Sequence, residues 1–267
     1  MPSMDIAFSS CPNDTFIFHA MLHDHVDTGD VIYQSHISDV EDLNHRAMDG
    51  MYAVSKLSFH AYLHLRHAYT LLDSGAALGY GCGPLVVASS RRSLHGRKVA
   101  IPGQYTTAHL LLKLWDPDIT DIHVARFDEI LPGIQSGRFD AGVIIHEGRF
   151  VYPSYGCIEI VDLGKWWEEK TGMPIPLGCI AIRNDQHSIQ YRETVENHIR
   201  KSVRFAFDNP QYSRDYIKSL AQELDDHVIQ EHINLYVNDF TISLGEKGRE
   251  AIRTLEEMAK CKNIIPR

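Results

Sequence analysis

The segment Gly75-Ala-Ala-Leu-Gly-Tyr-Gly-Cys-Gly-Pro84 separates two parts of the chain in which short apolar runs alternate with helical patterns. Its four glycines and its proline are incompatible with an ordinary helix or a central strand. The apolar run Leu85–Ala88 follows it, and a new alternating series begins near Arg97. Because such alternation is typical of α/β proteins, the segment predicts a passage from one α/β unit to another.

The apolar and helical patterns predict the elements of both units. Before the glycine-rich segment we expect strands at 5–8, 31–33 and 52–55, and helices at 16–22, 39–48 and 59–67. After it we expect strands at 85–88, 98–101 and 141–145, and a helix at 106–115. A second interruption, Pro174-Ile-Pro-Leu-Gly178, leads to a strand at 179–182, and from Ser188 onward the pattern is mainly helical.

Two interruptions predict two lobes joined by two connections. We expect the first lobe to comprise residues 1–86 and 181–267, including the C-terminal helices, and the second to comprise residues 87–180. A ligand cleft between the lobes is the natural consequence, because small-molecule sites occur preferentially at such interfaces.

The composition narrows the class of protein. The 267 residues are 44% hydrophobic and 23% charged, which is ordinary for a globular chain of this size. With 26 basic and 35 acidic residues the net charge is −9, which argues against a nucleic-acid partner. Neither an export signal nor a membrane-spanning apolar run is evident. We expect no membrane association, and the sequence leaves open a monomer or a homodimer.

The five cysteines are scattered and form no Cys-x-x-Cys pair. This pattern predicts reduced thiols in a cytoplasmic protein, with neither a disulfide framework nor a cysteine zinc site.

Polar segments follow two predicted strands of the first unit, where open α/β sheets bind their ligands. In Cys11-Pro-Asn-Asp-Thr15, Asn13 or Asp14 either caps the next helix or leaves its amide groups free for a ligand. In Ser55-Lys-Leu-Ser58, Lys56 either binds a carboxylate with help from the serines or is a solvated loop lysine.

The second unit offers two further candidates. Thr106 and Thr107 follow Pro102-Gly103 and open a helix, so their hydroxyls and the free amides favour contact with an anionic ligand. His146 directly follows the apolar run 141–145, at the carboxyl end of a buried strand. With an ordinary pKa near 6.5, a histidine there is suited to act as a general base.

Metal and nucleotide sites have weaker support. His60, His64 and His67 would share one helix face and could ligate zinc or nickel, but no cysteine or carboxylate lies nearby to complete the set. The Asp24/Asp27/Asp30 cluster lacks the pattern of a calcium loop. The sequence also lacks a Gly-x-Gly-x-x-Gly motif and a P-loop. We therefore expect neither a metal nor an organic cofactor.

Several blocks of the sequence together resemble a known enzyme family. They are Ser10-Cys-Pro-Asn-Asp-Thr-Phe16, Ser55-Lys-Leu-Ser58, Gly83-Pro-Leu-Val-Val87, Pro102–Ala108, Ile144-Ile-His-Glu147, Val161-Asp-Leu-Gly-Lys-Trp-Trp-Glu-Glu169 and Pro174–Gly178. In this order, and over essentially the whole chain, they are similar to the 1,4-dihydroxy-6-naphthoate synthases of futalosine-pathway menaquinone biosynthesis.

The resemblance implies a fold and a reaction. The fold is that of type II periplasmic binding proteins, an α/β fold with an interlobe active-site cleft. The reaction is the cleavage of cyclic dehypoxanthinyl futalosine, a small carboxylate, to 1,4-dihydroxy-6-naphthoate and a dihydroxyacetone fragment, without cofactor or metal. The family's proton acceptor falls on His146. Its substrate-contacting segments fall on Ser55, Lys56 and Leu57 and on Thr106 and Thr107, and we add Asn13 and Ser58 as further candidates.

Two other functions share this fold. A chorismate dehydratase of the same pathway would act on a different substrate. A non-catalytic small-molecule binding protein would have no need of a base at His146. The block Ile144-Ile-His-Glu147 favours the synthase.

Overall fold

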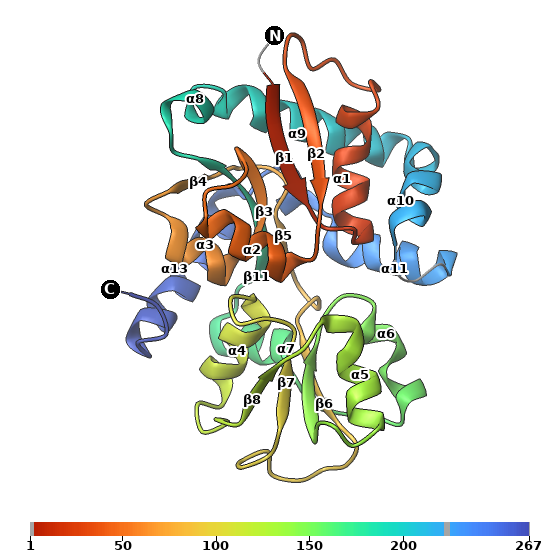
Figure 1. The fold of residues 1–267 in the computed structure, drawn as a ribbon, viewed down its shortest axis with the longest axis vertical. Coiled ribbons are helices and arrows are strands. Elements are labelled where there is room, and N and C mark those ends of the chain that lie inside the picture. Colours follow the sequence, from red (N-terminus) through yellow and green to blue (C-terminus); the bar gives the residue numbers. More distant parts are fainter. Residues whose placement is uncertain (1–2, 222–224, 267) are drawn as a thin grey trace.

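A computed structural model describes residues 3–221 and 225–266. Within these ranges the strands form two sheets, which lie in separate halves of the molecule (Figure 1). Sheet A contains β1 (Ser3–Phe8), β2 (Ile32–Ile37), β3 (Val54–Ser58), β4 (Tyr69–Leu71), β5 (Ala77–Gly79) and β11 (Ile175–Arg183). Sheet B contains β6 (Leu85–Ala88), β7 (Val99–Ile101), β8 (Ile122–Val124), β9 (Ala141–Ile144) and β10 (Ile158–Asp162).

Both sheets are mixed. Sheet A has the order β2-β1-β3-β11-β4, with β1 parallel to β2 and β3, and with β11 antiparallel to β3, β4 and β5. Sheet B has the order β10-β6-β9-β7-β8, with β7 parallel to its two neighbours and β6 antiparallel to its own. The α/β class is therefore confirmed.

Helices connect and cover the strands. With sheet A lie α1 (Pro12–Leu22), α2 (Val40–Met48), α3 (Phe59–Leu65) and the C-terminal helices α8 (Gln186–Ile189), α9 (Arg192–Asp208), α10 (Arg214–Leu220), α11 (Asp226–Tyr236), α12 (Asp239–Ile242) and α13 (Gly245–Cys261). With sheet B lie α4 (Thr107–Trp115), α5 (Phe127–Gln135), α6 (Gly148–Val151) and α7 (Leu163–Thr171). Short 3-10 turns occupy Tyr152–Tyr155 and Pro210–Ser213.

The central strands of sheet A are buried on both faces, as strand β11 illustrates. Ile180 and Ile182 pack with β1, α1 and α9, whereas Cys179 and Ala181 pack with the core that continues towards sheet B. This alternation follows from the two-residue period of a strand. Almost every residue of α1 is buried, because α9, α10 and α11 all pack against it.

The chain passes between the halves twice, after β5 and before β11. We propose that the lobes divide at these passages, a few residues from the predicted boundaries 86/87 and 180/181, since those positions lie inside β6 and β11. At the first passage Gly83 contacts Gly164 so closely that a Cβ added to Gly83 would stand 2.2 Å from the Gly164 backbone.

Two local predictions were wrong. Lys56 lies inside β3 rather than beyond its end. Strand β11 begins at Ile175 and includes Pro176, although the prolines indicated an interruption. Proline is tolerated there because the pairing with β5 shifts register between Pro176 and Gly178.

In the part of the chain that the structure describes, no helix is long and apolar enough to cross a membrane.

Candidate active site

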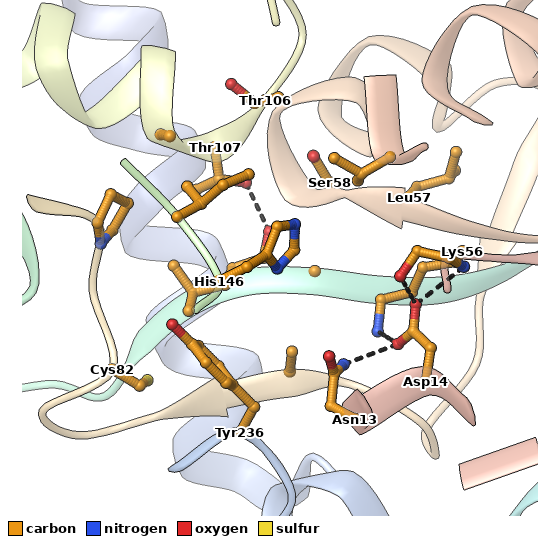
Figure 2. Close-up of a pocket in the computed structure, with 18 residues that line it drawn as sticks. Asn13, Asp14, Lys56, Leu57, Ser58, Cys82, Thr106, Thr107, His146 and Tyr236 are labelled. Atoms are coloured by element: carbon orange, nitrogen blue, oxygen red, sulfur yellow. Dashed lines mark hydrogen bonds and ion pairs between the residues drawn. The ribbon is translucent and has the colours of Figure 1, made fainter. Parts of the chain in front are cut away.

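A cavity of about 90 Å³ lies between the two sheets (Figure 2). The cavity brings together most of the predicted site residues, namely Asn13, Lys56, Leu57, Ser58, Thr106, Thr107 and His146. Ser55 does not line it. The Ser55 side chain is fully buried within β3, and its hydroxyl donates to the Lys56 carbonyl at 3.1 Å.

Lys56 forms a buried ion pair with Asp14. Its Nζ lies 2.6 Å from Asp14 Oδ1, and the two side chains are only 6% and 1% exposed. The alternative of a solvated loop lysine is therefore wrong. Because the Asp14 carboxylate already balances its positive charge, Lys56 lines the cavity as part of an ion pair with no net charge.

Asp14 is the centre of a wider polar network. Its Oδ2 accepts hydrogen bonds from the Ser9 hydroxyl at 2.7 Å and the Ser9 amide at 3.2 Å, and its Oδ1 also accepts from Asn13 Nδ2 at 2.8 Å. Asn13 Oδ1 in turn accepts from His232 Nε2 at 3.0 Å. Asn13 and Asp14 do not cap α1, whose N-cap residue is Cys11.

His146 follows β9 and faces the cavity from the sheet B half. Its φ of 54° lies in the left-handed region, which is uncommon outside glycine and recurs at functional sites. The Sγ of Cys11 lies 3.4 Å from Nδ1 and 3.5 Å from Nε2. The rings of Phe127 and His232 lie at centroid distances of 5.1 and 6.0 Å. The His146 ring is thus in contact with residues of both halves.

Burial of the His146 ring lowers its pKa to about 4, the Asp14 carboxylate raising it and the Lys56 ammonium lowering it further. The expected pKa near 6.5 was therefore wrong. The local sequence around His146 does not show that residues from the other half of the molecule exclude water from the ring. The imidazole is neutral at neutral pH and able to accept a proton.

The two threonine hydroxyls are already engaged. Thr106 Oγ1 donates to the Gly103 carbonyl at 2.8 Å and accepts from the His109 amide, as an N-cap residue does. Thr107 Oγ1 donates to the Leu177 carbonyl at 2.7 Å and accepts from the His60 amide. Neither hydroxyl has a proton left for a ligand, so this wall of the cavity offers mainly the first amide groups of α4.

Helix α11 contributes two residues that the sequence did not single out. His232 joins the network through Asn13, and Tyr236, one turn later, lines the cavity. Their spacing of four residues places both on one helix face, but a His and a Tyr at that spacing are also common in an ordinary core.

In the described part of the chain, the predicted histidine face (His60, His64 and His67) does not form a group of potential metal ligands. Among the described residues, the one group of three potential ligands with mutually close ligand atoms is His95, Asp116 and Asp118, at the end of α4. His95 and Asp118 are exposed, and none of the three residues lines the cavity.

Comparison with solved structures identifies the fold. A crystal structure of a protein from Archaeoglobus fulgidus superposes with a TM-score of 0.93 at 38% identity, covering 98% of each chain. A Candida albicans protein described as having the generic periplasmic binding protein fold superposes with a TM-score of 0.68 at 13% identity, covering 100% of this chain and 92% of its own. The predicted two-lobed periplasmic-binding-protein-like fold is confirmed.

Sequence comparison identifies the family. A 1,4-dihydroxy-6-naphthoate synthase of Thermus thermophilus is 44% identical over 265 residues, which cover 99% of this chain and 96% of the relative. The synthase of Streptomyces coelicolor is 41% identical over 270 residues, which cover 99% and 95%. The family described as menaquinone biosynthesis matches residues 4–261. The chain therefore belongs to this menaquinone biosynthesis family.

Proposed function

We propose that this protein is a 1,4-dihydroxy-6-naphthoate synthase, a lyase that cleaves cyclic dehypoxanthinyl futalosine to 1,4-dihydroxy-6-naphthoate and a dihydroxyacetone fragment. The observation that carries the proposal is the position of the His146 imidazole, which follows β9 and lines the cavity between the sheets. The names of the two relatives support the choice of reaction.

His146 accepts the first proton in this proposal. The C–H bond next to the substrate ketone breaks, its proton goes to an imidazole nitrogen, and its electron pair moves into the ketone to form an enolate. A pKa of about 4 makes the imidazole a weak base, but one that is unprotonated at neutral pH. The Asp14 carboxylate favours the protonated ring, so it assists proton uptake. Loss of the sugar fragment then gains driving force from aromatisation.

The substrate carboxylate binds at the start of α4 in this proposal. The first amide groups of a helix lack partners within the helix and favour an anion. Thr106, Thr107 and Ala108 bring this end of α4 to the cavity. Ser58 lies on the wall as well; its hydroxyl accepts from Asn44 Nδ2 at 3.3 Å and donates to no residue in the described part of the chain. Lys56 is the less suitable partner, because Asp14 already neutralises it.

The test is turnover of cyclic dehypoxanthinyl futalosine by the purified protein in the presence of EDTA, with 1,4-dihydroxy-6-naphthoate detected by chromatography and mass. We expect product from the wild type and a loss of at least about 100-fold in kcat for His146→Ala, the usual contribution of a general base. The control is His187→Ala, which removes an exposed imidazole of α8.

The rival functions give different results. Binding of the compound without product would indicate a binding protein. Conversion of chorismate to 3-[(1-carboxyvinyl)oxy]benzoate would indicate the dehydratase. Unchanged turnover by a folded His146→Ala variant would exclude His146 as the base.

A further inference from the structure

Tyr236 is the last residue of α11 and lines the cavity while being only 8% exposed. Its ring packs on His232 at a centroid distance of 4.6 Å, and His232 packs in turn on His146. Figure 2 shows the Tyr236 hydroxyl on the side of the cavity near Cys82, pointing away from Asn13.

The Tyr236 hydroxyl has no hydrogen-bond partner among residues 3–221 and 225–266. The Tyr236 oxygen is open to the cavity rather than enclosed by protein, whereas enclosed tyrosine hydroxyls usually have a partner. Tyr69, for example, donates to the Tyr52 carbonyl at 3.0 Å, and the Tyr33 hydroxyl lies 2.8 Å from His198 Nδ1. An unpaired hydroxyl on a cavity wall points to a partner that enters with the ligand.

The two ends of the cavity differ in polarity. The network of Asn13, Asp14 and Lys56 lies at one end and suits the hydroxyl groups of a sugar. Tyr236 lies on the other side, with Cys82 and His146 (Figure 2), and the cavity lining also includes apolar residues that suit a flat aromatic ring, such as Pro84, Ile145 and Leu177. An oxygen atom on that ring would lose its water there, so it needs a hydrogen-bond donor from the protein.

We propose that the Tyr236 hydroxyl donates a hydrogen bond to an oxygen atom on the aromatic part of the substrate, an inference that rests on the proposed function. Tyr236 is then a substrate-binding residue. Burial raises the pKa of its hydroxyl, although the nearby Arg149 guanidinium lowers it in part. The hydroxyl therefore keeps its proton and acts as a donor rather than as a base.

The experiment compares wild type with Tyr236→Phe, which removes the hydroxyl and keeps the ring against His232. We measure kcat and KM for cyclic dehypoxanthinyl futalosine, and the dissociation constant of 1,4-dihydroxy-6-naphthoate by calorimetry under anaerobic conditions. Loss of one neutral hydrogen bond raises KM and the dissociation constant by about three- to tenfold, with kcat little changed. A rise of more than about tenfold would identify a carboxylate as the bound group.

The matched control is Tyr69→Phe, which removes a hydroxyl that bonds within the protein away from the cavity. We expect it to lower the unfolding temperature and to leave KM and the dissociation constant unchanged. Wild-type values of both constants in Tyr236→Phe would overturn the role of Tyr236, while wild-type turnover would still support the proposed function. A wild type that neither binds nor converts the compound would overturn both.

Discussion

Asp14 and Lys56 carry opposite charges in a place that water scarcely reaches. Removing one member of a buried pair leaves an uncompensated charge, which typically costs about 3–5 kcal/mol. We expect Asp14→Asn to lower the free energy of unfolding by about this amount, because Lys56 loses its partner and the new amide group faces the donors on Asn13 and Ser9.

Urea unfolding monitored by circular dichroism checks this prediction. Adding Lys56→Met to Asp14→Asn removes the stranded charge and should recover part of the loss. Glu169→Gln, which breaks an exposed pair with Lys165, is the control and should change little. An Asp14→Asn variant as stable as the control would show that the pair contributes nothing.

Single residues of the site were predictable where a local pattern marks them. His146 stands directly after an apolar run, and this position predicts the carboxyl end of a strand. The protonation state of His146 was not predictable, because its lowered pKa depends on burial against other parts of the chain, including Cys11 and His232. Those contacts join positions 135 and 86 residues apart, which no spacing rule connects.

At the scale of elements, the start of α7 packs directly against the segment that leads into β6. Gly83 and Gly164 meet backbone to backbone, and a Cβ at position 83 would stand 2.2 Å from two Gly164 backbone atoms. Neither backbone can yield as a flexible side chain would. We expect Gly83→Ala to destabilise the protein by at least about 1–3 kcal/mol, the usual cost of overpacking.

A thermal melt of Gly83→Ala beside Gly148→Ala measures this effect. Gly148 lies in α6, where an added Cβ would meet only ordinary contacts, the nearest at 3.4 Å. Its substitution should leave the melting temperature nearly unchanged. Equal melting temperatures for the two variants would contradict the close packing of α7 on this segment.

Helices and strands were predictable where the spacing of apolar residues agrees with the residues that begin or end the element. The helix 39–48 was expected from its apolar spacing, and α2 begins after Asp39, whose side chain accepts from the Glu41 amide. The pattern failed in β3 and β11. A lysine in a buried strand needs the Asp14 carboxylate, and a proline in a strand needs a register shift, and both compensations come from distant residues.

The whole molecule places its site between two sheets, and the glycine-rich segment predicted that division. The segment did not predict which parts of the chain supply the residues of the site. Sheet B and its loops provide His146, whereas α11, from the end of the chain, provides His232 and Tyr236. The helical pattern after Ser188 indicated that helices form, but helix propensity carries no information on which face meets the cavity.

The folded protein as a whole holds several histidines neutral. Burial lowers the pKa of His60 to about 3 and of His19 and His146 to about 4, and it also lowers the pKa of His64, His109, His198 and His232. In the unfolded chain a histidine has a pKa near 6.5. Between about pH 6.5 and pH 4 the unfolded state therefore binds more protons than the folded state.

This difference predicts a loss of stability in mild acid. The free energy of unfolding is retained above about pH 6.5 and falls as the pH is lowered towards 4, with each fully responding histidine contributing up to about 1.4 kcal/mol per pH unit. Urea unfolding at pH 7.5, 6.5 and 5.5 measures the slope. His60→Gln removes one buried imidazole and should make the slope shallower, whereas His187→Gln removes an exposed one and should leave it as in the wild type. If His60→Gln left the slope unchanged, the His60 ring would be hydrated in the folded protein. In the structure, His60 Nδ1 lies 3.2 Å from the Thr106 carbonyl, where α3 packs against the start of α4. An unchanged slope would mean that this packing is looser than the geometry implies.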